Sequence, residues 1–255
     1  MIEIMSVRLS VIIPSYNEKR NLASNVLDPV LSYLQSQSFD WELILSDDGS
    51  TDGTLESLDA FAKKDRRITV LANQHAGKAP TVAAGMMAAT GEWRLFTDFD
   101  QSTPIVELEK LWGWTEKGYE VVIGSREIAG AKRDVEPWYR HLMGKGFNVV
   151  VQVLTVRGIH DTQCGFKLFS SHATQTLFPK LVVYASPAVR SDAFTGAFDV
   201  ELLYLAKKNS FTIKEVPIHW QHNPTNRVSP VRDSVRMFRD VFKIKLSDWL
   251  GRYDA

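Results

Sequence analysis

Residues 7–18, V-R-L-S-V-I-I-P-S-Y-N-E, change character halfway along. Apolar side chains fall at every second position of 7–13, which is the period of a β-strand, and Pro14 then leads into a polar loop. Apolar residues return at helical spacing over 22–34, although Pro29 should kink or split such a helix. This stretch therefore predicts a strand, a loop and then a helix.

The same unit recurs through the first half of the chain. Further strands are expected at residues 41–46, 68–71 and 93–97, with helices between them at 54–64 and 79–89. Strands that alternate with helices form right-handed βαβ crossovers and a largely parallel sheet covered on both faces. The pattern predicts an α/β fold, a three-layer α/β/α sandwich with a mostly parallel mixed sheet.

The second half is less regular, but it has no clear linker, internal repeat or low-complexity tract. Strands are expected at 121–124, 166–169 and 211–216, and helices at 138–155, 199–207 and 231–250. We therefore expect one domain over residues 1–255.

The composition excludes several classes of protein. The chain has 255 residues, 44% of them hydrophobic and 24% charged, as expected of a folded domain. Its 30 basic residues balance 30 acidic ones, so no charge excess indicates a nucleic-acid partner. The single cysteine, and the lack of a secretory signal or an apolar run of about 20 residues, favour a cytoplasmic protein without a membrane-spanning helix.

Four polar loops follow expected strands, at residues 14–18, 47–50, 98–100 and 124–126. In an open parallel sheet, ligands bind in the crevice outside the carboxyl ends of the strands. We therefore expect these loops to form one site.

Asp98 and Asp100 are two residues apart after a strand, so their carboxylates can point the same way. Their repulsion is relieved by a hard divalent cation, Mg²⁺ or Mn²⁺, which a substrate diphosphate would help to ligate. A solvated turn is the alternative. The chain has no G-x-x-x-x-G-K-[ST] loop, and Gly144-Lys145-Gly146 lacks the third glycine of a dinucleotide fingerprint, which disfavours an ATPase or a dehydrogenase.

An ordered set of motifs over nearly the whole chain carries a family resemblance. The motifs are S-V-I-I-P-S-Y-N-E at 10–18, S-D-D-G-S-T-D-G-T at 46–54, G-K at 77–78, T-D-F-D-Q-S-T-P at 97–104, G-S-R at 124–126, D-T-Q-C-G-F-K at 161–167 and F-D-V-E-L-L at 198–203. The chain resembles glycosyltransferase family 2, the inverting enzymes of the GT-A nucleotide-diphospho-sugar transferase fold. Within it, the dolichyl- or polyprenyl-phosphate glucosyl- and mannosyltransferases are the most similar.

The resemblance implies a nucleotide-sugar donor site. Its residues would be Pro14, Tyr16, Glu18 and Asp48 for the nucleoside, Lys78 and Arg227 for the diphosphate, and Asp98 and Asp100 for the metal. A turn is the alternative role for the Asp47-Asp48 pair, and we assign turn formation mainly to Gly49. The sequence T-D-F-D-Q-S-T-P departs from the mannosyltransferase pattern D-A-D-L-Q, which favours UDP-glucose over GDP-mannose as the donor.

The acceptor follows from the chemistry of the attacking oxygen. A phosphate monoester, with a second pKa of about 6, is already anionic at neutral pH and needs cations rather than a general base. By resemblance, Arg126, Arg140 and Lys167 line the acceptor side, with Arg126 and Asp100 counted as catalytic. If the acceptor is a saccharide or lipid hydroxyl, Asp199 or Asp161 is the candidate base. A third possibility is a sugar-nucleotide-binding protein without catalytic activity.

The C-terminal helix is basic and amphipathic. Seven basic residues against three acidic ones give residues 227–252 a charge of +4. Its apolar stripe consists of Val231, Val235, Phe238, Val241, Phe242, Trp249 and Leu250. The stripe either packs on the core or lies on an anionic membrane surface, which would make the protein peripheral at the cytosolic face. The expected organisation is a donor half at about 1–125, an acceptor half at about 126–230 and this helix at 231–250.

Overall fold

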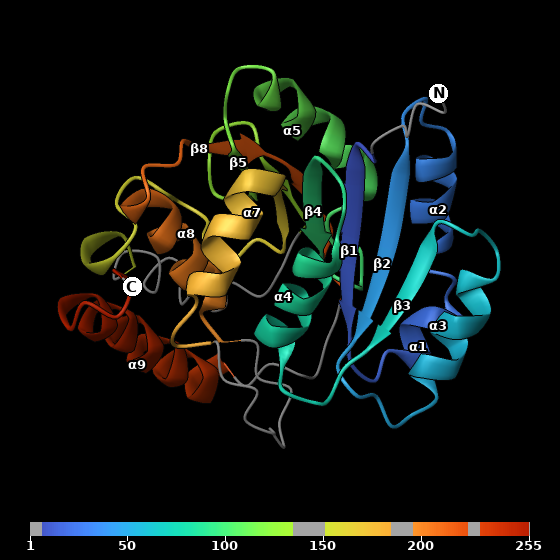
Figure 1. Cartoon of the computed structure of the whole chain (residues 1–255), viewed down its shortest axis with the longest axis horizontal. Coiled ribbons are helices and arrows are strands. Elements are labelled where there is room, and N and C mark those ends of the chain that lie inside the picture. Colours follow the sequence, from blue (N-terminus) through green and yellow to red (C-terminus); the bar gives the residue numbers. More distant parts are fainter. Residues whose placement is uncertain (1–6, 135–150, 185–195, 224–229, 255) are drawn as a thin grey trace, which may run out of the picture.

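The computed structural model describes residues 7–134, 151–184, 196–223 and 230–254, which form an α/β fold around a seven-stranded sheet (Figure 1). The expected strands all form. They are β1 (Leu9–Ser15), β2 (Trp41–Asp47), β3 (Ile68–Ala72), β4 (Trp93–Thr97), β5 (Val121–Ser125), β7 (Phe166–Ser170) and β8 (Ile213–Pro217). Two-residue strands β6 (Lys132–Arg133) and β9 (His219–Trp220) pair in a second, small sheet.

The sheet is mixed, with the order β3-β2-β1-β4-β7-β5-β8. Only β7 is antiparallel to its neighbours, pairing Phe166 with Thr97 of β4 and Lys167 with Ile123 of β5. The carboxyl ends of the other six strands therefore share one edge, and the start of β7 lies at that same edge. This arrangement confirms the expected mostly parallel sheet and the meeting of the polar loops.

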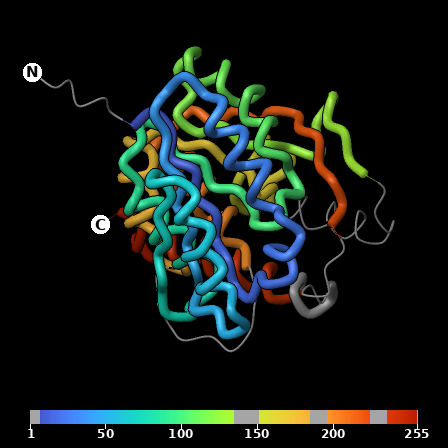
Figure 2. Tube along the Cα trace, turned by 90° about the vertical axis from the view of Figure 1, so that its right-hand side faces the viewer, coloured from blue at the N-terminus to red at the C-terminus, as the bar shows by residue number. Residues whose placement is uncertain are grey.

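Helices cover both faces of the sheet, as Figures 1 and 2 show. They are α1 (Lys19–Ala23), α2 (Asp28–Gln35), α3 (Thr54–Ala62), α4 (Lys78–Ala88), α5 (Leu108–Thr115), α7 (Ser171–Leu177), α8 (Phe198–Lys208) and α9 (Pro230–Trp249). Side chains of β1 alternate between two buried clusters. Ile12 packs with residues of α4, α7 and α8, whereas Val11 and Ile13 pack with residues of α2, α3 and α5. The sandwich is thus built on two cores, one on each face.

The first expected helix is split, but not at Pro29. The chain leaves helical geometry between α1 and α2, where Asn25 has a left-handed φ of 54°. Pro29 lies in the first turn of α2, a position where its missing N–H is not needed. The proline therefore begins the second helix and does not interrupt the first.

Two short helices lacked a sequence signal. α7 has the sequence S-H-A-T-Q-T-L, without apolar periodicity, and is capped by the Ser170 hydroxyl, which accepts from the Ala173 N–H at 3.0 Å. α5 follows a short 3₁₀ turn at Ile105–Glu107. Of the helix expected at 138–155, residues 138–150 lie outside the described part, and 151–154 are helical. Among the described helices, none is both long enough and apolar enough to cross a membrane.

Candidate active site

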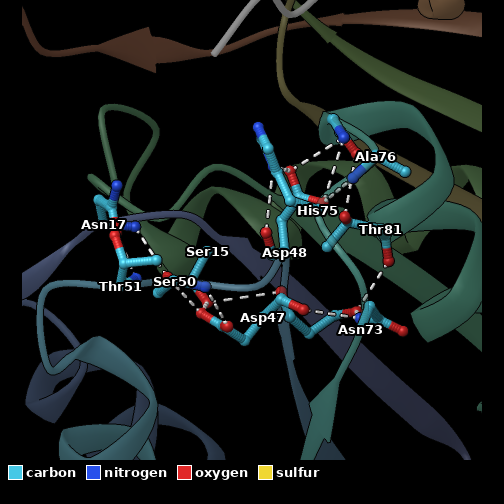
Figure 3. A network of polar contacts seen from close by, with 12 residues as sticks. Ser15, Asn17, Asp47, Asp48, Ser50, Thr51, Asn73, His75, Ala76 and Thr81 are labelled. Carbon is cyan, nitrogen blue, oxygen red and sulfur yellow. Dashed lines mark hydrogen bonds and ion pairs between the residues drawn. The ribbon is translucent and has the colours of Figure 1, made fainter. Parts of the chain in front are cut away.

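The loop after β2 is held to the end of β1 by Asp47. Its carboxylate accepts from the Ser15 hydroxyl at 3.0 Å and from the backbone N–H and hydroxyl of Ser50 at 2.8 and 2.6 Å (Figure 3). Gly49 has a φ of +69°, and a Cβ there would lie 2.9 Å from the backbone nitrogen of His75. Asp47 and Gly49 thus form the turn, as assigned from the sequence.

Asp48 points the other way, into the loop before α4. One carboxylate oxygen accepts from the Ala76 N–H at 2.8 Å, and the other accepts from the Gly77 N–H at 3.0 Å and contacts His75 Nδ1 at 2.9 Å (Figure 3). The side chain is almost fully buried. Asp48 therefore positions this loop, and its contact with a nucleobase stays a prediction.

His75 is a site residue that the sequence analysis missed. Its ring stacks on Tyr16, with centroids 4.1 Å apart and planes 4° apart, so a stacked aromatic pair lies beside Asp48. The second ring nitrogen, Nε2, is buried and has no hydrogen-bond partner among the described residues. The only sequence signal was the position of His75, two residues before Gly77-Lys78.

The other predicted nucleoside contacts lie close by in the chain. Pro14 is buried within β1, and the Glu18 carboxylate accepts from the Asn21 side-chain amide at 2.6 Å. Arg227, like the acceptor candidate Arg140, lies outside the described residues. The roles predicted for these residues stay predictions.

Lys78 is the first residue of α4, and its ammonium group forms an ion pair with Asp98. Burial acts to lower the pKa of Lys78, but the charges of Asp98, Asp199 and Asp100 outweigh it and the pKa is raised. In this conformation the Lys78 cation is paired with Asp98, and its contact with a diphosphate stays a prediction.

Asp98 and Asp100 act on each other, as two carboxylates near one point should. Burial, and then the charge of Asp98, raise the pKa of Asp100, whose carboxylate accepts from the Ser102 N–H at 3.0 Å. Asp98 is neutralised by the Lys78 cation. Lys78 compensates one of the two negative charges of this pair, and the remaining charge fits a divalent cation such as Mg²⁺ or Mn²⁺. The described residues contain no group of three or more metal-ligating side chains, so a substrate phosphate would have to complete such a site.

Lys167 and Asp199 form a buried ion pair. The lysine ammonium donates to Asp199 at 2.5 Å and also to the backbone carbonyl of Cys164, and its side chain has no exposed surface. Asp199 lies in the first turn of α8 and its charge reaches Lys78, which links the acceptor-side helix to the aspartate pair. In this conformation, Lys167 is a buried structural residue that binds Asp199, and its contact with an acceptor stays a prediction.

Arg126 and Asp161 form a second buried pair, at the end of β5. The guanidinium donates through Nε and Nη2 to the two carboxylate oxygens at 2.7 and 2.9 Å, and the Arg126 backbone N–H adds a third bond at 2.9 Å. Burial acts to raise the pKa of Asp161, but Arg126 outweighs it and lowers this pKa to about 2. The two residues are therefore a structural pair in this conformation, and direct contact of Arg126 with an acceptor stays a prediction.

Comparison with known sequences shows the family of the chain. The sequence profile described as "Glycosyl transferase family 2" matches residues 10–178. The chain is 34% identical to the dolichyl-phosphate beta-glucosyltransferase of Dictyostelium discoideum over 263 residues, 96% of this chain and 76% of that protein. The enzyme of the same name from Homo sapiens is 33% identical over 267 residues, 96% of this chain and 77% of that protein.

Solved structures agree on the fold. Glucosyl-3-phosphoglycerate synthase from Mycobacterium tuberculosis with UDP superposes with a TM-score of 0.63 at 20% identity, over 97% of this chain and 80% of that one. Mannosyl-3-phosphoglycerate synthase from Rubrobacter xylanophilus gives 0.59 at 15% identity, over 96% and 75%. These glycosyltransferase structures confirm the expected GT-A α/β architecture.

Proposed function

The chain belongs to glycosyl transferase family 2, and we propose that it transfers glucose from UDP-glucose to a polyprenyl phosphate such as dolichyl phosphate. The curated relatives that share about a third of its sequence are named for this reaction. The sequence T-D-F-D-Q-S-T-P at residues 97–104 also favours a glucosyl over a mannosyl donor. GDP-mannose is the alternative donor.

The ion pairs of the two candidate bases, Asp161 and Asp199, favour one kind of acceptor over the other. Asp161 is bound bidentately by Arg126 and has a pKa near 2, and Asp199 is buried against Lys167. The carboxylate of each residue is already bound by a cation, so neither is free to contact an acceptor hydroxyl as a base. A hydroxyl acceptor needs such a base, whereas a phosphate acceptor attacks as an anion. The geometry therefore favours the phosphate acceptor over a saccharide or lipid hydroxyl.

The donor would lie along the carboxyl edge of the sheet. Tyr16, His75 and Asp48 would hold the base, and Lys78 at the N-terminus of α4 would bind the diphosphate. Asp98 and Asp100 would hold Mg²⁺ or Mn²⁺, which, when bound, would neutralise the charge that grows on the departing diphosphate. An acceptor phosphate oxygen would bond to C1 of glucose as the bond from C1 to the diphosphate breaks, with inversion at that carbon.

The decisive assay compares two acceptors that differ only in the phosphate. Purified protein is incubated with labelled UDP-glucose, Mg²⁺ or Mn²⁺, and either polyprenyl phosphate or the parent polyprenol in detergent. We expect glucolipid only with the phosphate, and less product when GDP-mannose replaces UDP-glucose. Transfer to polyprenol or to a saccharide alone would refute the proposal. Donor binding without any turnover would support a non-catalytic protein.

Two variants test the assigned roles. Asp100→Asn should lower metal-stimulated turnover by at least about a hundredfold, since removing a charge-stabilising group at the reaction centre has costs of this order. Asp59→Asn, an exposed position on α3, is the matched control and should keep full activity. Loss of chemistry in Asp199→Asn, with acceptor binding retained, would instead support a hydroxyl acceptor with an aspartate base.

The location of the reaction completes the proposal. A lipid acceptor resides in a bilayer, so the enzyme would work peripherally at a membrane surface. Cys164 is the single cysteine of the sequence, so the sequence has no internal disulfide that would indicate an oxidising compartment. We therefore place the reaction at the cytosolic face of the membrane.

A further inference from the structure

Helix α9 carries two apolar faces, although the sequence suggested a single stripe. Val241 and Ile244 are fully buried against the core on α8, and Met237 and Phe238 are partly buried beside them. This face accounts for the packing of α9 on the protein. Four of the seven residues of the predicted stripe are exposed instead: Val235, Phe242, Trp249 and Leu250.

The second face points outward. Val235, Phe242, Leu246 and Trp249 are spaced by seven, four and three residues, so they fall on one side of the helix. Their exposed fractions are 64%, 61%, 52% and 83%. Leu250, directly after the helix, is 52% exposed and continues the row. Single exposed apolar residues are common, but a continuous row of this length indicates an interaction surface.

The charges around this row are positive. Arg239 and Lys243 are exposed on α9, and Arg252 is exposed just beyond its end. The described α9 side chains also include two carboxylates, and both are paired. Asp240 is buried and accepts from the Tyr184 hydroxyl at 2.6 Å and from the Lys243 ammonium at 2.9 Å, and Asp248 forms an ion pair with Lys208 at 2.6 Å. The outer face thus combines apolar side chains with cations.

Helix α9 lies toward the end of the molecule that holds the proposed site. In Figure 1, α9 runs along the lower left, toward the same end of the molecule as the carboxyl ends of β1, β2 and β3.

We propose that the outer face of α9, formed by Val235, Arg239, Phe242, Lys243, Leu246 and Trp249, docks the protein on an anionic lipid bilayer. The aliphatic and aromatic side chains would enter the headgroup boundary, and the cations would contact anionic headgroups. This charge complementarity favours a lipid surface over a second copy of the chain, whose same face would present like charges. The inference extends the proposed function, but its test contains neither donor nor acceptor.

The test is co-sedimentation of the whole protein with vesicles of phosphatidylcholine, with or without an equal part of phosphatidylserine. We expect binding to the anionic vesicles and much weaker binding to the neutral ones. Arg239→Gln should lower the partition coefficient on anionic vesicles roughly fivefold. Adding Lys243→Gln should lower it further by a smaller factor, because Lys243 is paired with Asp240. Phe242→Ser with Trp249→Ser should lower it at least about tenfold on both vesicle types.

Matched controls lie on other elements. Met87→Ser removes an exposed apolar side chain from α4, and Lys63→Gln with Arg66→Gln removes two exposed charges near the end of α3. These variants should bind vesicles as the original protein does. Equal loss in the controls, or no vesicle binding by the original protein, would overturn the inference.

A second copy as the occupant would show as a dimer in analytical ultracentrifugation that the Phe242→Ser, Trp249→Ser variant loses, and this result would also overturn the inference. Failure to bind vesicles, together with glucolipid formation from detergent-solubilised acceptor, would refute the docking surface and leave the proposed function standing.

Discussion

Gly165 shows how one hydrogen atom in place of a side chain can position the aspartate pair. A Cβ at this position would overlap the carboxylate of Asp98, while the Gly165 carbonyl accepts from the Asp98 N–H at 3.0 Å. Any other residue at this position would therefore displace the Asp98 side chain. Gly165 acts as a positioning residue for the proposed metal site.

We expect Gly165→Ala to cost about 1–3 kcal/mol of stability, because the added methyl group must displace a carboxylate. It should also weaken Mn²⁺ binding in the presence of UDP, measured by calorimetry or electron paramagnetic resonance. Gly113→Ala is the matched control, since a Cβ there meets nothing within 4 Å. In an Asp98→Ala background the stability cost of Gly165→Ala should largely disappear. An unchanged cost there would show that the clash with Asp98 is not the cause.

The Arg126–Asp161 pair makes the free energy of unfolding depend on pH in the acidic range. The pKa of Asp161 falls from 3.8 to about 2 on folding, so its contribution is present above pH 3.8 and lost as the pH falls through about 2. This shift corresponds to about 2 kcal/mol. Asp161→Asn leaves a buried guanidinium without its partner and should cost about 3–5 kcal/mol near neutral pH.

The measurement is urea unfolding of both proteins between pH 6 and pH 2.5. The stability gap between the original protein and Asp161→Asn should narrow as the pH falls, because acid also neutralises the original carboxylate. A gap that stays constant with pH would mean that Asp161 contributes by shape and not by charge.

At the scale of elements, one buried carboxylate joins α8 to the C-terminus. Glu201 accepts from the backbone N–H groups of Val182 and Val183, both at 2.8 Å, and from the Tyr253 hydroxyl at 2.7 Å. Burial raises the pKa of Glu201, and these donors act against that rise. The bond from Tyr253 fixes the chain after α9 to α8. It thereby also keeps α9 packed on α8 through one face, with the other face exposed.

Tyr253→Phe removes one of these donors and should cost about 1.5–3 kcal/mol, the usual range for a hydrogen bond to a charged group. Thermal or urea unfolding measures this loss. Tyr119→Phe is the control, since its hydroxyl makes no hydrogen bond within the part of the chain that the structure describes, and it should change stability little. Equal effects of the two substitutions would contradict the proposed anchoring.

At the scale of the whole molecule, β7 ties the two predicted halves together. This strand comes from the second half of the sequence, yet it lies between β4 and β5 of the first half. Separating the halves would break both ladders. The halves therefore differ in predicted role, for donor and acceptor, but share one sheet.

We expect this arrangement to unfold as one unit. Urea unfolding followed by far-ultraviolet circular dichroism and by tryptophan fluorescence should give coincident transitions. The seven tryptophans include Trp41 in the first half and Trp220 in the second, so the fluorescence samples both. Two separated transitions would instead mean that the donor and acceptor halves are independent domains.

The sequence by itself determined the features that depend on neighbouring residues. The strand at 7–13, the helices expected at 54–64 and 79–89 and the turn made by Gly49 follow from periodicity and backbone preference, which act over a few residues. The motif spacing likewise placed Asp98 and Asp100 at a strand end. The short helix α7 was not predicted, because its sequence has no periodic apolar face.

Only the tertiary structure decided which charges face one another and which faces are buried. Lys167 meets Asp199 across 32 positions of sequence, and Arg126 meets Asp161 across 35, so no local pattern could show that these cations are already paired. The stack of His75 on Tyr16 and the division of α9 into a buried and an exposed face have the same origin. Each depends on segments that are distant in sequence and are brought together by the sheet. Burial and ion pairing are therefore properties of the packed structure and cannot be inferred from the local sequence.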